Sequence, residues 1–409
     1  MRVVYLSHTG MTEPLGQSQV LPYLRGLTRR GADIEVLSFE PVGTSPGAVE
    51  TLRDGLRKDG IVWRPLVRSS SHAFSMKLYE AGQAVAGGLV ESLRKRAQII
   101  HARSYLPAAA AAVVSTLSPG ARFLFDNRGM VGDEYIDGGH WKRESASYRI
   151  VKRVERVLFD RADGLVVLTE ALRRWLLEHR LVGVRTEMEV VPCCVDVPRF
   201  AVGAEVRTAT RLELGVADRL VVVYSGTLGS WYRENEMARL VGRMRALHPK
   251  LTFLVLSRAP TDGLRAAALA AGLREHELVI RSAAPEEMPK LLSAGDLGLS
   301  LIDTCFSKIG SSPTKVAEYL AAGLPVVVNA GIGDQTDLRR EAGAAVVIDD
   351  LSSGSVDDAA APALALASRA HAERAATTVD VARRHFGLDD VGIPRYLGLY
   401  ERLVAKRAS

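Results

Sequence analysis

The sequence predicts an α/β protein built from two Rossmann-like domains, each with a doubly wound parallel sheet. Its 409 residues exceed the length of one ordinary domain, so two cores of normal size are expected. Short apolar runs alternate with helical segments through both halves, which is typical of parallel sheets. Apolar residues make up 47% and charged residues 24%, which excludes a disordered chain, a collagen-like repeat and a coiled coil.

The first half contains short apolar runs of the kind that form buried parallel strands. In order, they are Val3–Leu6, Ile34–Leu37, Ile61–Leu66, Gln98–Ile100, Arg122–Phe125, Gly164–Leu168 and Met188–Val191. Helical segments lie between most of them. After the first strand, residues 17–30 carry apolar side chains at helical spacing and end at Gly31, which predicts one helix there.

The second half repeats this pattern. Its predicted strands are Leu220–Tyr224, Leu251–Leu256, Leu278–Ile280, Leu297–Leu301, Pro325–Asn329 and Ala345–Ile348. Its predicted helices lie near Glu234–Leu247, Asp262–Ala271, Pro285–Ala294 and Pro313–Ala322. Residues 192–218 are polar and contain prolines, so we expect the connection between the domains there. The predicted domains are 1–197 and 198–376, followed by terminal helices over 377–409.

Charge and cysteine content exclude several functions. The net charge of +6 is mild for a chain of this size and does not indicate a nucleic-acid partner. Three cysteines without a C-x-x-C pair, and histidines without an H-E-x-x-H, argue against a disulfide scaffold, a zinc ribbon and that class of metalloprotease. The adjacent Cys193 and Cys194 are interpreted as packing residues. The chain opens on a predicted strand, and no run approaches the ~20 apolar residues of a spanning helix, so we expect a cytoplasmic protein.

Two familiar motifs are approached but not matched, and a third is matched in letters but not in context. Gly10 and Gly16 flank a loop that resembles a P-loop, but the spacing is one residue too long and the lysine is missing. Gly16 stays a candidate, because the backbone N–H groups of such a loop can still bind a diphosphate. Gly331 and Gly333 form half of a dinucleotide fingerprint, and the G-x-S-x-G at residues 43–47 lies in a polar loop with flanking prolines.

The stretch SKIGSSPTKVAEYLAAGLP, from residue 307 onward, has more chemical content. Its polar loop opens a helix at Pro313, since proline suits a first helical turn, and Ser311 or Ser312 suits the N-cap. Free N–H groups and the helix dipole favour an anion at this end, and Lys308 and Lys315 add positive charge.

A carboxylate follows on the same helix. Glu318 lies four residues beyond Thr314, so one helix face carries both side chains. Amides for phosphate and a carboxylate for ribose hydroxyls are what a nucleotide diphosphate needs. A capped surface helix with a Lys–Glu pair accounts for the same residues equally well.

Several longer stretches occur in a specific order: EPLGQSQVLPYLRGLTRRG, DNRGMVGDEYIDGG, RADGLVVLTEAL, VVPCCVD, YSGTLGSWY and SSPTKVAEYLAAGLPVVVNAGIGD. Together they resemble the family 4 retaining glycosyltransferases along nearly the whole chain. The resemblance implies the GT-B fold, in which two Rossmann-like domains face a central cleft and the C-terminal helices cross back to the first domain. It places the sugar nucleotide on the second domain and the acceptor on the first.

The resemblance also assigns residues to the donor site. Glu318 matches the second glutamate of the family's E-x7-E motif, which usually grips the ribose, while Gly310 stands where the first is expected. This departure indicates a subgroup with S-P-T-K-x-x-E-Y-L at this loop and helix. Gly226 and Thr227 keep the loop that follows the first strand of the second domain.

The family's usual lysine near that loop is not matched, because Trp231 and Tyr232 stand in its region. Lys308, Lys315 or Arg258 would supply the charge for the diphosphate instead. The other predicted members of the donor site are Gly16, Ser257, Ser311, Ser312 and Thr314. No D-x-D triplet is present, which favours a site that works without a metal.

In the first domain, Arg128 follows a strand where many relatives place a histidine of the catalytic site. Arginine does not give up its proton, so it would stabilise a departing phosphate or orient a sugar. Asp133 and Glu134 would bind acceptor hydroxyls or take a proton, and His101 stands at another strand end on the same edge. The alternatives are a salt bridge among Arg128, Asp133 and Glu134, and a structural role for His101.

Residues 141–161 hold seven Lys or Arg against three acidic residues, interleaved with apolar ones. A basic amphipathic helix of this kind can lie on an anionic membrane surface. A solvated helix face above a core-facing apolar stripe is the alternative that we prefer.

The sequence thus predicts a retaining glycosyltransferase. It would move a hexosyl or N-acetylhexosaminyl group from a nucleotide-diphosphate sugar to an acceptor hydroxyl, in polysaccharide or glycoconjugate biosynthesis. No cofactor is expected beyond this co-substrate, and no metal. The acceptor would be a sugar, a small molecule or a lipid-linked molecule, the last requiring peripheral contact with the inner face of the membrane. A sugar-nucleotide 2-epimerase on the same fold and a non-catalytic sugar-nucleotide-binding partner subunit are the alternatives.

Overall fold

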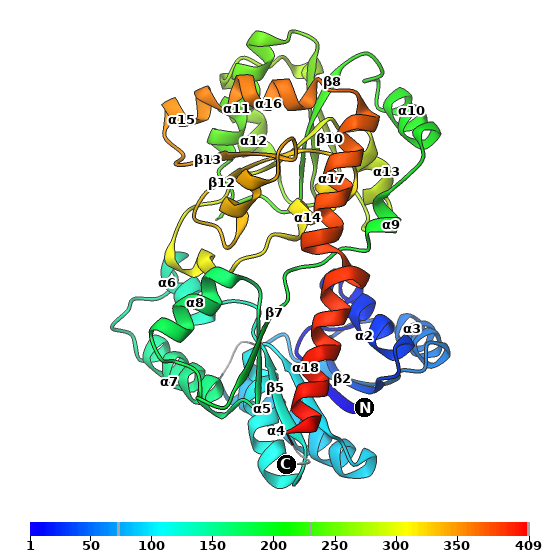
Figure 1. Cartoon of the computed structure of the whole chain (residues 1–409), viewed down its shortest axis with the longest axis vertical. Helices are drawn as coiled ribbons and strands as arrows, with labels where there is room; N and C mark the ends of the chain where they lie inside the picture. Colours follow the sequence, from blue (N-terminus) through cyan, green and yellow to red (C-terminus); the bar gives the residue numbers. More distant parts are fainter. Residues whose placement is uncertain (72–73, 230, 407–409) are drawn as a thin grey trace. The chain divides into compact units, whose positions relative to one another are not determined.

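The computed structural model describes residues 1–71, 74–229 and 231–406. The chain divides into two compact units, one of Met1–Pro192 with Gly392–Ser409 and the other of Cys193–Val391. Each unit is an α/β domain around a parallel sheet (Figure 1).

In the described part of the first unit, the sheet has seven strands in the order β3-β2-β1-β4-β5-β6-β7, all parallel. Each apolar run predicted in the first half coincides with one of them. The strands are β1 (Arg2–Ser7), β2 (Asp33–Pro41), β3 (Val62–Arg68), β4 (Ile99–Arg103), β5 (Arg122–Asp126), β6 (Gly164–Val167) and β7 (Glu187–Val190). The order reverses between β1 and β4, and ligands of such sheets bind at the carboxyl ends of strands next to a reversal.

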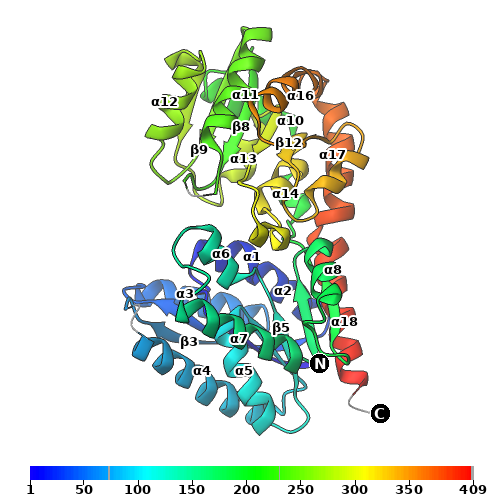
Figure 2. The ribbon, with the colours of Figure 1, turned by 90° about the vertical axis from the view of Figure 1, so that its left-hand side faces the viewer.

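Helices cover both faces of this sheet. They are α1 (Pro14–Gln19), α2 (Leu21–Arg29), α3 (Pro46–Lys58), α4 (Phe74–Lys95), α5 (Tyr105–Leu117), α6 (Val131–Asp137), α7 (Ala146–Arg161), α8 (Glu170–Glu178) and α18 (Ile393–Ala405). The helices α4, α5 and α7 pack together on one face, and α2 and α18 lie on the other (Figure 2). The prediction of a single helix over residues 17–30 is wrong, because the helical conformation is interrupted at Val20, between α1 and α2. Pro22 is the second residue of α2, and its ring cannot continue an existing helix.

The terminal helix α18 packs back on the first unit, against α2, β4 and β7. A glycine makes this close approach possible, since a Cβ atom on Gly26 would lie 1.9 Å from Cδ1 of Ile393. The sequence predicted that the helices from residue 377 onward pack on the first unit. In the structure, α17 (His371–Phe386) belongs to the second unit instead. There it packs on α14 (Thr314–Ala321).

The second unit repeats the same strand order. Its strands in the described residues are β8 (Leu220–Ser225), β9 (Leu251–Leu256), β10 (Leu278–Arg281), β11 (Leu297–Ser300), β12 (Val326–Asn329) and β13 (Ala345–Ile348). They form a parallel sheet in the order β10-β9-β8-β11-β12-β13, with the reversal between β8 and β11. Each apolar run predicted in the second half coincides with one strand.

Side chains alternate across this sheet, as the period of a β-strand requires. Val221 and Val223 of β8 enter the core beneath α14, whereas Val222 and Tyr224 enter the core beneath α11. The remaining helices and helical turns are α9 (Val197–Phe200), α10 (Ala204–Glu213), α11 (Glu234–Leu247), α12 (Asp262–Ala270), α13 (Met288–Ser293), α15 (Ser353–Asp358), α16 (Ala360–Ala367), η1 (Glu275–Glu277), η2 (Phe306–Gly310), η3 (Gln335–Arg340) and η4 (Leu388–Gly392).

The segment predicted as the connection, residues 192–218, differs from that expectation. It forms α9 and α10, and Val197 and Phe200 are buried in the core of the second unit. The division between the units therefore falls between Pro192 and Cys193, ahead of the predicted boundary at 197.

Candidate functional site

The strongest candidate site of the second unit is the start of α14. The helix begins after Pro313, and no side chain caps its first turn in the described structure. The predicted N-cap at Ser311 or Ser312 is wrong, because Ser312 Oγ accepts the N–H of Cys193 at 3.1 Å instead. The N–H groups of Thr314 and Lys315 lie in the first turn, which has no intrahelical acceptors, and so they can receive an anion.

Lys315 is buried at this point, with 8% of its surface exposed. Its ammonium lies 3.6 Å from the centre of the Tyr232 ring and 4.1 Å from the centre of the Tyr224 ring. Within the described residues, Nζ has no hydrogen-bond acceptor. Burial holds the pKa of Lys315 well below its ordinary value, with Glu318 opposing the shift. Lys315 is therefore a buried amine that two aromatic rings contact and that has no described hydrogen-bond acceptor, so a bound anion would favour its charged form.

Backbone pairing holds these rings in place. Tyr224 is the last but one residue of β8, and its hydroxyl donates to the carbonyl of Thr227. Tyr232 forms a short antiparallel bridge with Ile302, and the Asp303 N–H donates to the Trp231 carbonyl at 2.8 Å. Trp231 and Tyr232, which stand near the family's usual lysine position, form with Tyr224 an aromatic platform, on which the ammonium groups of lysines from other segments lie.

Lys308 is the second cation on this platform. It lies in η2, is 7% exposed, and places its ammonium 3.6 Å from the centre of the Trp231 ring. Gly310 is buried in the same turn, so no carboxylate stands where the family's first glutamate is expected. The two lysines and the open end of α14 together give this edge of the sheet positive charge.

Glu318 lies one turn further along α14 and is partly exposed. Burial raises its pKa to about 7, although Lys315 and Arg199 oppose the shift. The next residue anchors the helix to the sheet, since the Tyr319 hydroxyl accepts the N–H of Ser225 at 2.6 Å. A carboxyl group that is half protonated near neutral pH can both donate to and accept from a ligand hydroxyl.

The other predicted donor residues of this unit lie around β8 and β9. Gly226 has φ +117°, which favours glycine, and a Cβ there would lie 3.1 Å from Lys315 Nζ. The structure therefore brings Gly226 to Lys315, with the exposed Thr227 following. Ser257 Oγ accepts the N–H of Ala259 at 3.1 Å, and the exposed Arg258 donates through Nε to a backbone carbonyl at 3.0 Å. Ser257 is thus engaged by its own loop, and Arg258 by the carbonyl of Ala283 in the loop after β10.

The remaining predicted donor residue, Gly16, lies in the first unit and has a packing role. A Cβ there would lie 2.1 Å from the carbonyl oxygen of Gly10. The amides of the preceding loop already bind carboxylates, because Met11 N–H donates to Glu40 at 2.7 Å and Gly10 N–H donates to Glu13 at 2.7 Å. These N–H groups are not open for the diphosphate that the sequence suggested.

A buried carboxylate organises the carboxyl ends of β4 and β5. Asp126 is fully buried and lies 3.6 Å from His101 Nε2, 3.2 Å from Arg103 and 3.4 Å from Arg128. Burial alone would raise its pKa, but Arg128, His101 and Arg103 hold the pKa far below the ordinary value. Arg128 is thus held beside Asp126 at the end of β5, and sequence reasoning missed Asp126.

His101 faces the terminal helix. Its Nδ1 lies 2.7 Å from the Tyr400 hydroxyl, and its ring packs 4.6 Å from the Tyr5 ring, centre to centre. The side chain is 2% exposed, and burial lowers its pKa. This placement favours the structural alternative for His101 over contact with a substrate.

Asp133 belongs to a second buried network. It is 2% exposed and accepts from the Tyr148 hydroxyl at 3.0 Å and from Lys152 Nζ at 2.9 Å. Lys152 also pairs with the buried Glu155. Arg128 thus pairs with Asp126, and Asp133 pairs with Lys152. The carboxylate of Glu134 packs against Gly129, since a Cβ atom added to Gly129 would lie 2.7 Å from Glu134 Oε1.

His8 is a candidate that sequence reasoning missed. It follows β1 directly, at the strand-order reversal, and 26% of its side chain is exposed. Its Nε2 lies 3.1 Å from Glu80, and burial lowers its pKa, so the ring is neutral at pH 7 and can accept a proton. Its position right after the first strand is the signal that could have identified it.

The basic helix α7 follows the preferred prediction in part, because Leu158 and Phe159 are buried on its inner side together with Glu155. Three further apolar residues do not join them, since Ile150, Val154 and Val157 are 55%, 38% and 51% exposed. These three residues lie on one side of the helix, since they are spaced by four and three positions. A second apolar stripe thus faces outward.

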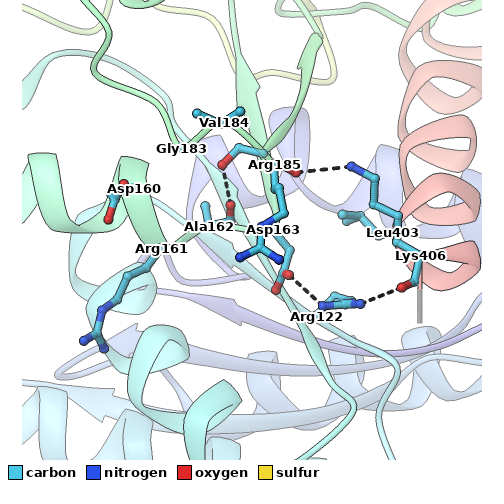
Figure 3. A pocket seen from close by; sticks show the side chains of 11 residues that line it. Arg122, Asp160, Arg161, Ala162, Asp163, Gly183, Val184, Arg185, Leu403 and Lys406 are labelled. Atoms are coloured by element: carbon cyan, nitrogen blue, oxygen red, sulfur yellow. Dashed lines mark hydrogen bonds and ion pairs between the residues drawn. The ribbon is translucent and has the colours of Figure 1, made fainter. Parts of the chain in front are cut away.

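A surface cavity of about 890 Å³ lies at the amino ends of β5 and β6 (Figure 3). Figure 3 shows Arg122 bridging Asp163, at 3.0 Å, and the carbonyl of Lys406, at 2.8 Å. Lys406 in turn donates to the Arg185 carbonyl at 3.2 Å. None of the residues that we predicted for the site lines this cavity, which opens at the edge opposite the carboxyl ends of the strands.

Comparisons with known proteins bear on the fold and on the first unit. Residues 16–194 match the family model described as a glycosyl transferase 4-like domain. The comparison with curated proteins gave no match. In the described parts of the chain, no helix has the length and apolar character that crossing a membrane requires.

Solved structures align along the whole length. The Anabaena protein HepE in complex with UDP has a TM-score of 0.71 and 15% identity, with 100% of each chain covered. A glycosyltransferase from Rickettsia africae has a TM-score of 0.71 and 14% identity over 98% of each chain. WaaG, a glycosyltransferase involved in lipopolysaccharide biosynthesis, has a TM-score of 0.64 and 16% identity over 100% of each chain. These similarities confirm the predicted GT-B fold.

Proposed function

We propose that this protein is a retaining glycosyltransferase that binds a nucleotide-diphosphate sugar on its second unit. One observation carries the proposal: the ammonium of Lys315 is buried at the uncapped start of α14 without an acceptor among the described residues. Burial disfavours the charged form of this amine, and a bound diphosphate would offset that cost. HepE, which shares the fold, was crystallised with UDP and with UDP-glucose, and a ligand of that class is proposed here.

The proposed chemistry assigns a role to each group. The diphosphate lies against the first-turn amides of α14 and the ammonium groups of Lys315 and Lys308. The bond from the anomeric carbon to the β-phosphate oxygen breaks, and a bond from that carbon to the acceptor oxygen forms. The acceptor proton passes to the departing diphosphate. The cations and amides stabilise the negative charge that develops on that phosphate, which lowers the barrier. Retention of configuration rests on the resemblance to the family.

Glu318 is assigned to the ribose hydroxyls. Its raised pKa of about 7 is consistent with this role, because a hydroxyl can hydrogen-bond to either protonation state. The acceptor is assigned to the first unit, whose residues 16–194 match the glycosyl transferase 4-like model. There Arg128, Glu134 and the half-buried His8 lie near the carboxyl ends of strands and remain candidates for contact with the acceptor. His101 and Asp133 would act as positioning residues.

Nucleotide binding tests the proposal first. We expect one of UDP, GDP, ADP, CMP and TDP to raise the unfolding temperature, by several degrees at a hundred times its dissociation constant. Lys315→Met should weaken binding of that nucleotide by about a hundredfold, because a charge-assisted contact and a counterion are lost together. Lys250→Met is the matched control, since Lys250 is an exposed lysine of the same unit. Equal binding by the wild type and both variants would contradict the proposal.

Product analysis separates the proposed reaction from its alternatives. With the nucleotide identified, incubation of its sugar conjugates with acceptor mixtures should release the nucleoside diphosphate and extend an acceptor. Interconversion of two nucleotide sugars without an acceptor would indicate the epimerase instead. Tight nucleotide binding without turnover in any mixture would indicate the non-catalytic partner subunit.

For the acceptor, we propose a lipid-linked molecule, reached by peripheral contact of α7 with an anionic membrane. Ile150, Val154 and Val157 form an outward apolar stripe, and exposed arginines flank it at positions 149, 153, 156 and 161. An apolar stripe bordered by cations is the pattern of a helix that lies in the headgroup region. The cations complement anionic lipids, and the apolar side chains would leave water.

Vesicle sedimentation tests this contact. The protein should sediment with vesicles that contain phosphatidylglycerol, should stay in solution with phosphatidylcholine alone, and should be released by salt. Replacing Ile150 and Val157 by serine should reduce sedimentation severalfold. The control is Leu212→Ser, which changes an exposed apolar residue on α10. Unchanged sedimentation of the Ile150/Val157 variant would show that α7 is not the contact.

A further inference from the structure

A second positively charged site lies in the second unit, away from Lys315. A cavity of about 390 Å³ opens beside the amino ends of β8 and β11. Six residues of β8 span roughly 20 Å, so this edge is well separated from the carboxyl ends where Lys315 lies. The charged and imidazole side chains of its lining are Arg207, Arg211, Asp218, Arg219, His248, Asp296, Arg369, His371 and Arg374.

Positive charge exceeds negative charge in this cavity. The buried Asp296 accepts from Arg207 at 2.6 Å, from Arg374 at 2.7 Å and from Arg211 at 3.2 Å. Burial alone would raise its pKa, but Arg207, Arg374 and Arg211 hold the pKa below its usual value. The lining thus holds two carboxylates, Asp218 and Asp296, against five guanidinium groups. A cluster with this imbalance attracts an anion, because buried like charges repel one another.

Several buried nitrogen atoms of the cavity have no hydrogen-bond partner among the described residues. Arg374 is 4% exposed, and its Nε is one of these atoms. Its other nitrogens are taken by Asp296 and by the carbonyls of Ala367 and Arg369, so the guanidinium is fixed in place. Nδ1 of His371 and Nδ1 of His248 are likewise buried without a partner. Unsatisfied polar atoms of a native protein require a ligand, an ion or water.

The start of α17 adds further donors. The helix runs from His371 to Phe386, and its N-cap is Ala370, whose side chain cannot accept a hydrogen bond. The N–H groups of the first turn therefore lie open beside Arg374, and the helix dipole makes this end positive. An uncapped helix start beside a fixed, buried guanidinium is the arrangement that binds a tetrahedral oxyanion.

We propose that this cavity binds a phosphate group, carried by a small molecule or as the free ion. The oxyanion would lie against the first-turn amides of α17 and accept from Arg374 Nε, with the exposed Arg369 closing over it. His371 and His248 would supply further donors through their ring nitrogens. A cavity of about 390 Å³ exceeds the volume of one phosphate ion, so it leaves room for an attached group such as a sugar. The site is independent of the proposed donor site.

Titration with inorganic phosphate in a Lys315→Met background tests the proposal, since that change weakens binding at the donor site. With histidine labelled by ¹⁵N, we expect the signals of His371 and His248 to shift and saturate, whereas chloride at matched ionic strength leaves them in place. His371→Gln and His248→Gln assign the two signals. Arg369→Gln should weaken phosphate binding by about tenfold, because it removes a charge-assisted contact. Arg265→Gln changes an exposed arginine on α12 and should bind as the parent does.

Comparison of ligands identifies the source of the phosphate. Tighter binding of hexose phosphates than of inorganic phosphate would assign the site to a phosphorylated metabolite. Equal binding would assign it to the free ion. Phosphate binding that is indifferent to Arg369→Gln, or the absence of histidine shifts at millimolar phosphate, would overturn the proposal.

Discussion

Buried charged side chains of the two units have different surroundings. In the first unit, Asp126 is enclosed by His101, Arg103 and Arg128, and Asp133 is enclosed by Lys152 and Tyr148. In the second unit, the buried Lys315 contacts two aromatic rings and has no hydrogen-bond acceptor among the described residues, and only Glu318 opposes the lowering of its pKa. Charges that the fold itself neutralises serve the fold, whereas a buried charge left without a counterion indicates a ligand.

The largest expected effect is on stability and concerns Asp126, the buried charge that the first unit neutralises. Asp126→Asn removes the negative charge but keeps the shape, so three basic side chains are left around a neutral amide. We expect the first unit to lose about 3–5 kcal/mol of unfolding free energy, as is typical when one partner of a buried ion pair is removed. Nucleotide affinity should not change, since Asp126 lies outside the unit that binds it.

Urea denaturation followed through the first unit measures this loss. Asp59→Asn, which breaks the more exposed pair with Arg25, should stay within about 0.5 kcal/mol of the wild type. A loss of nucleotide affinity in the folded Asp126→Asn variant would mean that the cluster serves the donor site.

The second prediction concerns Glu318, where we expect stability and binding to move in opposite directions. Its pKa of about 7 exceeds the ordinary 4.5, so the fold favours the protonated form. Stability is therefore complete below the ordinary pKa and falls as the pH rises through the folded pKa. Glu318→Gln should regain about 1–2 kcal/mol at about pH 8, discounted for partial exposure, and nothing at about pH 4.

The same variant should bind the nucleotide about tenfold more weakly, because a hydrogen bond from the ribose to a charged group is lost. Denaturation at the two pH values and calorimetric titration provide the two readouts. A stabilised variant with unchanged affinity would remove Glu318 from the ribose site while leaving its buried titration intact.

The sequence predicted the sheets well, because buried parallel strands are continuous apolar runs, and each predicted run coincides with a strand. It also placed Lys315 and Glu318 on a helix that begins beside them. The N-cap was missed because Ser312 binds Cys193, which lies 119 positions away. The role of His101 was left open for the same reason, since its partner Tyr400 is 299 positions away. Local spacing carries no information about such contacts.

The third prediction uses the pKa of Lys315. Because burial holds this pKa well below its ordinary value in the free protein, binding a diphosphate should draw a proton onto the amine. Affinity should then fall by about tenfold for each pH unit above that lowered pKa. The nucleotide phosphate, with a pKa of about 6, acts in the opposite direction only at lower pH.

Calorimetry in buffers with different ionisation enthalpies measures the proton uptake directly. Lys315→Met should abolish the uptake and flatten the pH profile above neutrality, whereas Lys250→Met should retain both. Binding without proton uptake in the wild type would mean that Lys315 is already charged and paired in the free protein.

The smallest effect tests whether His101 belongs to the fold or to the chemistry. Tyr400→Phe removes the hydroxyl that lies 2.7 Å from His101 Nδ1 but keeps the ring that packs against it. We expect a loss of about 1 kcal/mol in stability, the worth of one hydrogen bond, and an unchanged pH–rate profile. Tyr396→Phe is the matched control, since this buried ring also packs on His101, at 5.4 Å. A proton-transferring His101 would instead shift the profile when Tyr400 is changed, because its basicity depends on the partner of its other nitrogen. That result would place His101 among the reacting groups and would make α18, through Tyr400, part of the catalytic apparatus.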